Sequence, residues 1–361
     1  MRTPGILKEV RMPRKKFYHY YLPVHPNLEQ LKHQAKDLLR AIREGDPDAA
    51  AELRKHHPRK IDPAWAKLAD SQLVIARAYQ VESWPRLVLA CQMIDAIWAD
   101  DIDAVRDLVE KHPELLRESA SGVPGSNWGA PMSYAANLGR DRMIEMLRGL
   151  GAEDVQGAFG RACLQGRTQT ARKLLAMGAH LTPGIVMGPC EGLNGEGLAM
   201  LLELGAELAD ASGNGLEPVA LILETYSRDP AGKHRCLELI AERGFELPDT
   251  PMMAVHLGRI DLLEAHFKRD ASIVRRTFSH EEIYPLALGC HADHSLALHG
   301  TPIAGTTLLH ICADFDELDI ARWLIDHGAD VNARAEVDAD GFGGHTALFN
   351  CVVSQAHCCG L

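Results

Sequence analysis

The sequence predicts an all-α fold, a solenoid of stacked helical pairs with a helical cap at its N-terminal end. The chain has 361 residues, 46% of them hydrophobic, which is enough to bury a sizeable core. A frame of about twelve residues recurs along it, opening with a small or acidic turn residue and continuing as an apolar helix to a closing turn. Because each unit of such an array contacts only its neighbours, the default function is binding rather than catalysis. The seven copies run from Asp100 to His112, Gly139 to Gly151, Gly166 to Gly178, Leu193 to Gly205, Gly232 to Gly244, Gly258 to Asp270, and Asp316 to Gly328.

The most regular unit covers residues 306–334. Its first helix is expected to open at Thr307 and to present an apolar face, because Leu308, Ile311 and Cys312 recur at helical spacing. Gly328 suits the left-handed position that closes a helix, since glycine has no Cβ to clash. The second helix is expected to bury four residues at three- and four-residue steps: Ile320, Ala321, Leu324 and Ile325.

This unit resembles an ankyrin repeat. The family's T-P-L-H-x-A-A motif is matched by residues 307–313, with Leu308 in place of Pro and Cys312 in place of Ala, and its G-A-D-V-N turn is matched in full by residues 328–332. Residues 130–136 and 250–255 are looser copies, and the resemblance extends over roughly residues 86–361. It implies a scaffold that binds a protein partner on its concave or turn-tip face, not an enzyme, without a cofactor. It also implies that His310 bonds neighbouring backbone.

The spacing of the frames departs from a strict repeat in three places. Residues 182–192 are rich in Gly and Pro, so the first helix of the fourth pair is expected to be short. The 58-residue step from Gly258 to Asp316 predicts an insertion at about 271–305. An eighth unit opens at His345 and stops at Leu361, before a second helix. We expect an incomplete last repeat from a longer array; the alternative is an end covered by another molecule.

The region before the repeats divides into a basic tail, residues 1–26, and a helical cap, residues 27–85. Asn27 and Ser83 are expected to be N-caps, and Gly45 with the Asp and Pro that follow it ends the first helix. Residues 73–77 and 83–85 resemble the helical leader that precedes ankyrin repeats in some bacterial proteins. Its physical role would be to cover the open face of the first repeat.

Charge and cysteine content exclude several function classes. Residues 1–60 hold 14 Lys or Arg against 7 Asp or Glu, whereas the remainder carries a net charge of −18, which gives −11 for the chain. An acidic array disfavours nucleic acid as a partner, and no apolar run is long enough for membrane insertion. Nine Cys without paired spacing indicate reduced thiols and a cytoplasmic location.

The insertion carries the candidate site residues. Its His and aromatic side chains are expected to be exposed and to form one wall of the partner site, on the turn-tip side, so that deleting the insertion would abolish binding without unfolding the array. The expected partner-binding residues are Tyr284, His291, His294 and His299.

A rival hypothesis makes the same segment a metal-dependent or enzymatic site. Residues 280–299 contain His280, Cys290 and His291 as well as the two later histidines, and thiolate with imidazole suits Zn²⁺. The spacing matches no standard zinc motif, so a polar loop is favoured. Residues 338–341 are interpreted as a turn rather than a calcium loop, and residues 357–359 as an unpacked end rather than a metal site.

Overall fold

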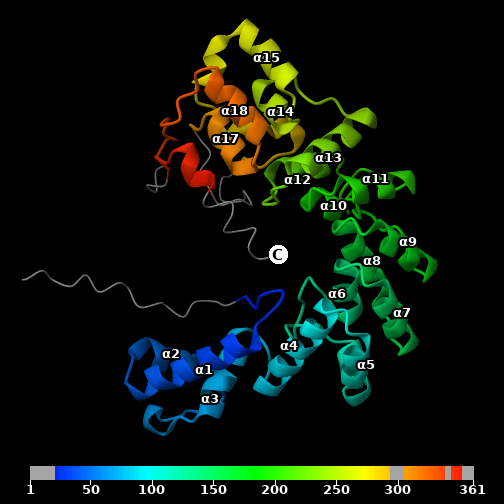
Figure 1. Ribbon diagram of the computed structural model, residues 1–361, viewed down its shortest axis with the longest axis vertical. Helices are drawn as coiled ribbons and strands as arrows, with labels where there is room; N and C mark the ends of the chain where they lie inside the picture. The colour runs from blue at the N-terminus through cyan, green and yellow to red at the C-terminus, as the bar shows by residue number, and fades with distance from the viewer. Residues whose placement is uncertain (1–20, 293–304, 338–342, 352–361) are drawn as a thin grey trace, which may run out of the picture. The chain divides into compact units, whose positions relative to one another are not determined.

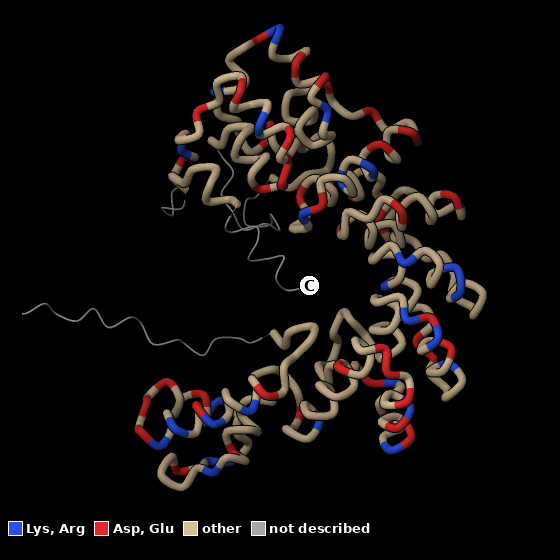
Figure 2. The backbone as a smooth tube through the Cα atoms, in the orientation of Figure 1, with Lys and Arg blue, Asp and Glu red and all other residues tan. Residues whose placement is uncertain are grey.

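The computed structural model describes residues 21–292, 305–337 and 343–351, which form two compact units, Met1–Pro131 and Met132–Leu361 (Figure 1). Within these described residues the secondary structure is helical, with two isolated antiparallel bridges, Phe278 to Thr306 and Val337 to Gly343. Figure 2 shows acidic and basic residues interspersed along the helices of each unit. No helix in the described ranges is long and apolar enough to cross a membrane.

The first unit is built on an amphipathic helix that starts and stops where the sequence predicts. The backbone N–H of Gln30 donates to Oδ1 of Asn27 at 2.9 Å, and Gly45 takes a left-handed φ of 78° just after the helix. Leu38 and Val74, each 1% exposed, lie in the core that this helix shares with its neighbours. The elements are α1 (Leu28–Arg43), α2 (Pro47–His56), η1 (Pro63–Trp65), α3 (Leu68–Ala78), α4 (Trp84–Trp98), α5 (Ile102–Lys111) and η2 (Pro113–Leu116).

The second unit is a stack of helical pairs. Its first helix, α6, begins at Pro131, one residue before the start of the unit. The first helices of the pairs pack on one another from α8 to α10 to α12, and the second helices from α9 to α11 to α13 (Figure 1). The pairs are α6 (Pro131–Asn137) with α7 (Asp141–Gly149), α8 (Val155–Leu164) with α9 (Thr168–Ala176), α10 (Met187–Glu191) with α11 (Gly195–Glu203), α12 (Glu217–Glu224) with α13 (Pro230–Glu242), α14 (Pro251–His256) with α15 (Ile260–Arg269), and α17 (Leu308–Phe315) with α18 (Leu318–Asp326).

The twelve-residue frame corresponds to the second helix of each pair, bracketed by left-handed backbone. The opening residue has positive φ in six copies, including the non-glycine residues Asp100, Leu193 and Asp316. The closing glycine also has positive φ, 99° at Gly151 and 90° at Gly328. Such a residue reverses the chain between the two helices and after the second, which explains why Gly and Asp recur at these positions.

The length of α10 and the burial of residues on α18 can be compared with the predictions from sequence. The helix before the fourth copy of the frame, α10, is only 5 residues long, as the Gly- and Pro-rich sequence predicts. On α18, Ile320 and Leu324 are buried, but Ile325 is 47% exposed. Its expected place in the buried stripe is wrong, because a single stripe of this short helix faces α17 while Ile325 lies at its edge.

The insertion follows α15 and contains η3 (Ala271–Val274), α16 (His280–Ile283) and η4 (Leu286–Leu288). Helix α14 packs directly on α17, so the stack continues across the inserted segment. The described part of the insertion packs on the stack at two places, because η3 contacts α17 and η4 contacts α12. A division of the repeats from the helical cap at residue 85 stays a prediction.

Candidate functional site

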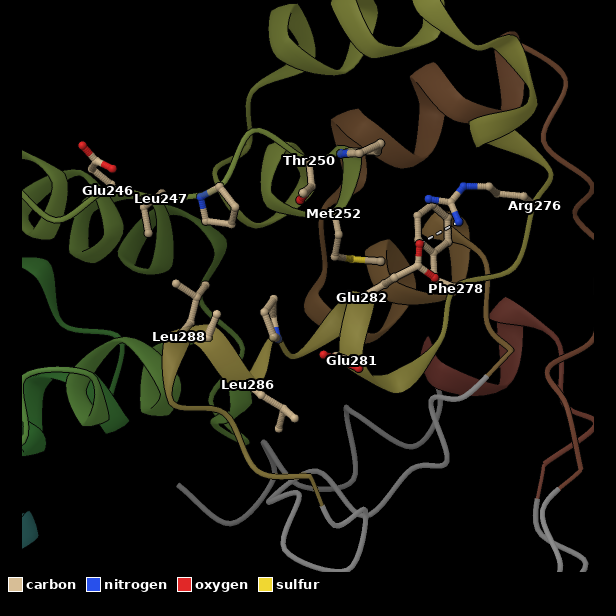
Figure 3. A pocket seen from close by; sticks show the side chains of 14 residues that line it. Glu246, Leu247, Thr250, Met252, Arg276, Phe278, Glu281, Glu282, Leu286 and Leu288 are labelled. Carbon is tan, nitrogen blue, oxygen red and sulfur yellow. Dashed lines mark hydrogen bonds and ion pairs between the residues drawn. The ribbon is translucent and has the colours of Figure 1, made fainter.

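A cleft of about 570 Å³ lies between the insertion and the loop that joins α13 to α14 (Figure 3). Residues 246–252 form one wall, and residues 276–288 contribute the other. The floor is apolar: Met252 and Phe278 are each 2% exposed, and Leu288 is 6% exposed. The loop wall is the segment that precedes α14, the first helix of its pair.

Local capping fixes the walls of this cleft. The Oγ1 of Thr250 accepts the backbone N–H of Met253 at 3.1 Å, which starts α14. Ser279 and Glu282 form a capping box that starts α16. At the other end, Gly289 has φ 85°, and a Cβ there would lie 2.8 Å from Cβ of Leu216, so glycine lets η4 approach the segment before α12.

The rim of the cleft is acidic. Glu246, Glu281 and Glu282 line it with a single basic residue, Arg276. The Arg276 guanidinium carbon lies 3.8 Å from the ring centroid of Phe278, and its Nη1 lies 2.8 Å from Oε1 of Glu282. Burial raises the pKa of the Glu282 carboxyl, but hydrogen bonds from the Ser279 N–H and Arg276 outweigh it and lower that pKa overall.

Tyr284 does not lie on the exposed wall where the sequence analysis places it. Its side chain is 0% exposed, with its ring centroid 5.6 Å from that of His280 and 6.5 Å from that of His256 on α14. The expected exposure is wrong because the insertion folds back onto α14 and α17. Phe278 exchanges backbone hydrogen bonds with Thr306 and Gly305 at 2.8 and 2.9 Å, which holds this part of the insertion at the start of α17.

His291 is the one predicted site residue that the structure describes near the surface. Its backbone N–H and its ring Nδ1 each lie 2.8 Å from a different carboxylate oxygen of Glu224 on α12. The hydrogen bond to Glu224 raises the pKa of His291, against a smaller effect of burial. The side chain is 43% exposed, so it remains accessible beside the ion pair. His294 and His299 lie outside the described residues.

The rival metal site gains no support from the described residues. Cys290 is 5% exposed, and burial raises the pKa of its thiol. No group of three or more His, Cys, Asp or Glu within the described ranges is placed to hold a metal ion. Residues 338–341 and 357–359, interpreted above as a turn and an unpacked end, lie outside those ranges.

A buried lysine between α13, α14 and α17 was not predicted from the sequence. Lys233 is 1% exposed, its Nζ lies 2.7 Å from Nδ1 of His256, and it sits 3.4 Å from the ring centroid of Phe315. Burial lowers the pKa of Lys233 to about 7, although the nearby Glu317 carboxylate favours the charged form. Burial likewise holds the pKa of His256 well below its usual range, so its Nδ1 can accept from the lysine.

One ion pair and one histidine–carboxylate contact lie near this lysine. Arg228 lies 3.1 Å from Asp314, with side chains 6% and 2% exposed, and His234 lies 2.8 Å from Glu317. Both pairs join residues next to or within α13 to residues of α17 or its C-terminal turn. Buried charges need such partners, so the cluster ties the α13 region to α17 across the intervening pair of α14 and α15.

The last pair also shows the bonding expected of its motif. The Nδ1 of His310 accepts the backbone N–H of Thr307 at 3.2 Å, and its Nε2 lies 3.2 Å from the carbonyl oxygen of His345 in the following unit. His310 is thus a structural residue that joins two units.

One repeat of the chain matches a known protein family. Residues 304–336 match the family model described as ankyrin repeat. Among solved structures, the chain is similar to the ankyrin repeat domain of human ASB11, with 21% identity over 64% of this chain and 98% of that chain and a TM-score of 0.30. No curated protein sequence matches the chain. The pair formed by α17 and α18 is therefore an ankyrin repeat.

Proposed function

We propose that this protein is a scaffold that binds a protein partner at the cleft between residues 246–252 and 276–288. Ankyrin repeats are generally protein–protein interaction modules and are typically not enzymes. The proposal adds where the partner binds: on the turn-tip face, with the insertion as one wall. His291, in the same insertion, remains a proposed partner contact.

One observation carries the proposal. Leu286 is 47% exposed at the mouth of the cleft, above a floor of buried apolar side chains. Leaving an apolar side chain in water beside a concave apolar surface costs free energy, and such places are preferred interaction sites. The free, buried thiols of the repeats support a reducing compartment, so we place the function in the cytoplasm.

The experiment compares two leucine-sized residues with equal exposure. Leu286→Gln removes the apolar mouth of the cleft, and Ile325→Gln makes the same change on α18, where Ile325 is also 47% exposed. Proteins captured from cell lysate by the wild type and by Ile325→Gln, and identified by mass spectrometry, should include at least one that Leu286→Gln fails to retain. Identical captures by all three proteins would show that partners bind elsewhere.

A further inference from the structure

The chemistry of the cleft also specifies what kind of segment it accepts. We propose that its occupant is an extended segment of the partner with one large apolar side chain next to a Lys or Arg. This inference rests on the proposed partner site and adds the class of ligand. It follows from the floor, the rim and the stiffness of the walls.

The floor selects an apolar side chain. Met252 and Phe278 close the bottom of the cleft, and Leu247 and Leu286 flank it on opposite walls (Figure 3). The guanidinium of Arg276 lies over the Phe278 ring, so the ring's outer face is already covered. An entering side chain meets the carbon and sulfur atoms of Leu247, Met252 and Leu286, and the affinity comes from apolar area removed from water.

The rim selects a positive charge beside that side chain. Arg276 pairs with Glu282 at 2.8 Å, which leaves Glu246 and Glu281 as exposed carboxylates on the two walls without a basic neighbour among the lining residues. Two like charges among the residues that line one cleft attract a cation and repel an acidic segment. A Lys or Arg next to the apolar anchor would place its charge at this rim.

The walls are stiff. Pro248 and Pro251 lie on the loop wall and Pro285 on the insertion wall, and each fixes one backbone dihedral. A preformed cleft loses little conformational entropy on binding, which favours capture of a short flexible segment. Charge complementarity also disfavours the chain's own residues 293–304 as the occupant, because that segment contains one Asp and no Lys or Arg.

Selection from a library of short random peptides displayed on phage tests this inference on the full-length protein. Enriched peptides should contain an apolar residue adjacent to Lys or Arg. A synthetic peptide of the enriched sequence should bind roughly 3- to 30-fold more weakly to Glu246→Gln/Glu281→Gln, an effect that shrinks as salt is raised. Glu203→Gln/Glu264→Gln removes the same charge from α11 and α15 and should bind like the wild type.

The other outcomes separate this inference from the proposed function. Enrichment of peptides without a basic residue, or no enrichment, would overturn the ligand class, while a partner lost on Leu286→Gln would leave the partner site standing. Peptides that bind only after residues 293–304 are replaced by a Gly/Ser linker would make that segment the occupant. A dimer that dissociates on Leu286→Gln would make the occupant a second copy of this chain. Either result rejects the proposal.

Discussion

The last helical pair and the insertion before it both contain fully buried side chains, but the sequence predicts this burial only for the helical pair. Leu324 on α18 and Tyr284 in the insertion are each 0% exposed. Leu324 belongs to a repeated frame whose period fixes which face points inward. Tyr284 lies in a segment of short helical turns, where no period exists, and its burial depends on α14. The difference shows that a repeat predicts packing within its units and is silent about what is inserted between them.

The largest expected effect tests whether the insertion is part of the core. Tyr284→Ala should lower the free energy of unfolding by about 3–5 kcal/mol, the usual cost of removing a buried aromatic side chain. Leu286→Ala, two residues away and half exposed, should change it by less than about 0.5 kcal/mol. Urea unfolding followed by circular dichroism measures both. Similar small values for the two variants would mean that the insertion is a surface loop, as the sequence analysis expected.

Deletion of the insertion is consequently a poor test of binding. Residues 278, 283, 284, 288 and 290 are all buried, so their removal uncovers apolar surface on the helices that they contact. We expect the deleted protein to lose cooperative melting as well as its partner. Point changes at the rim separate the two effects, because they leave the floor in place.

The second effect tests the repeat frame itself. Leu324→Ala should cost about 2–5 kcal/mol, because the side chain is fully buried between α17 and α18. Ile325→Ala changes the next residue, which is half exposed, and should cost much less. Equal losses on chemical unfolding would contradict the orientation of α18. Comparing these two variants also tests the sequence prediction, in which both residues are buried.

The sequence predicted the helices, their caps and their turns, since these depend on residues close together in the chain. Asn27 and Ser83 cap α1 and α4, and the frame locates the second helix of every pair. The sequence places the candidate site in the insertion but no more closely than that. The cleft arises where residues 246–252 meet residues 276–288, and no local pattern encodes that approach. The acidic rim could have been noticed from Glu281 and Glu282, but their setting could not.

The third effect concerns Lys233, which no sequence pattern distinguishes. Lys233 has a pKa of about 7 in the folded protein, against about 10.4 in an unfolded chain. Between these two pKa values the unfolded state binds more protons than the folded state. Lys233 therefore makes the free energy of unfolding rise as pH rises, and fall as pH falls toward 7. The slope from Lys233 is at most about 1.4 kcal/mol per pH unit.

Lys233→Met should remove that slope between about pH 7 and 8.5, the window in which buried thiols do not yet oppose it. The exposed Lys268→Met should leave the slope as in the wild type. Urea midpoints at several pH values measure the difference. The groups that face Lys233 are Arg228, His256, Asp314, Glu317 and Cys290. A slope that persists unchanged in Lys233→Met would show that Lys233 does not cause it.

The smallest effect lies in the first unit and depends on local chemistry alone. Asn27→Ala should destabilise α1 by about 1 kcal/mol, because the backbone N–H of Gln30 loses the side-chain oxygen that it donates to at 2.9 Å. Asn27→Asp keeps an acceptor at this position and should restore most of the loss. Amide hydrogen exchange in α1 reports the change directly, since a long helical array opens locally rather than all at once. If Asn27→Ala left that exchange unchanged, the helix would start independently of its cap. The contrast between locally encoded elements and the insertion would then weaken, because tertiary packing would set the start of α1 just as it buries Tyr284.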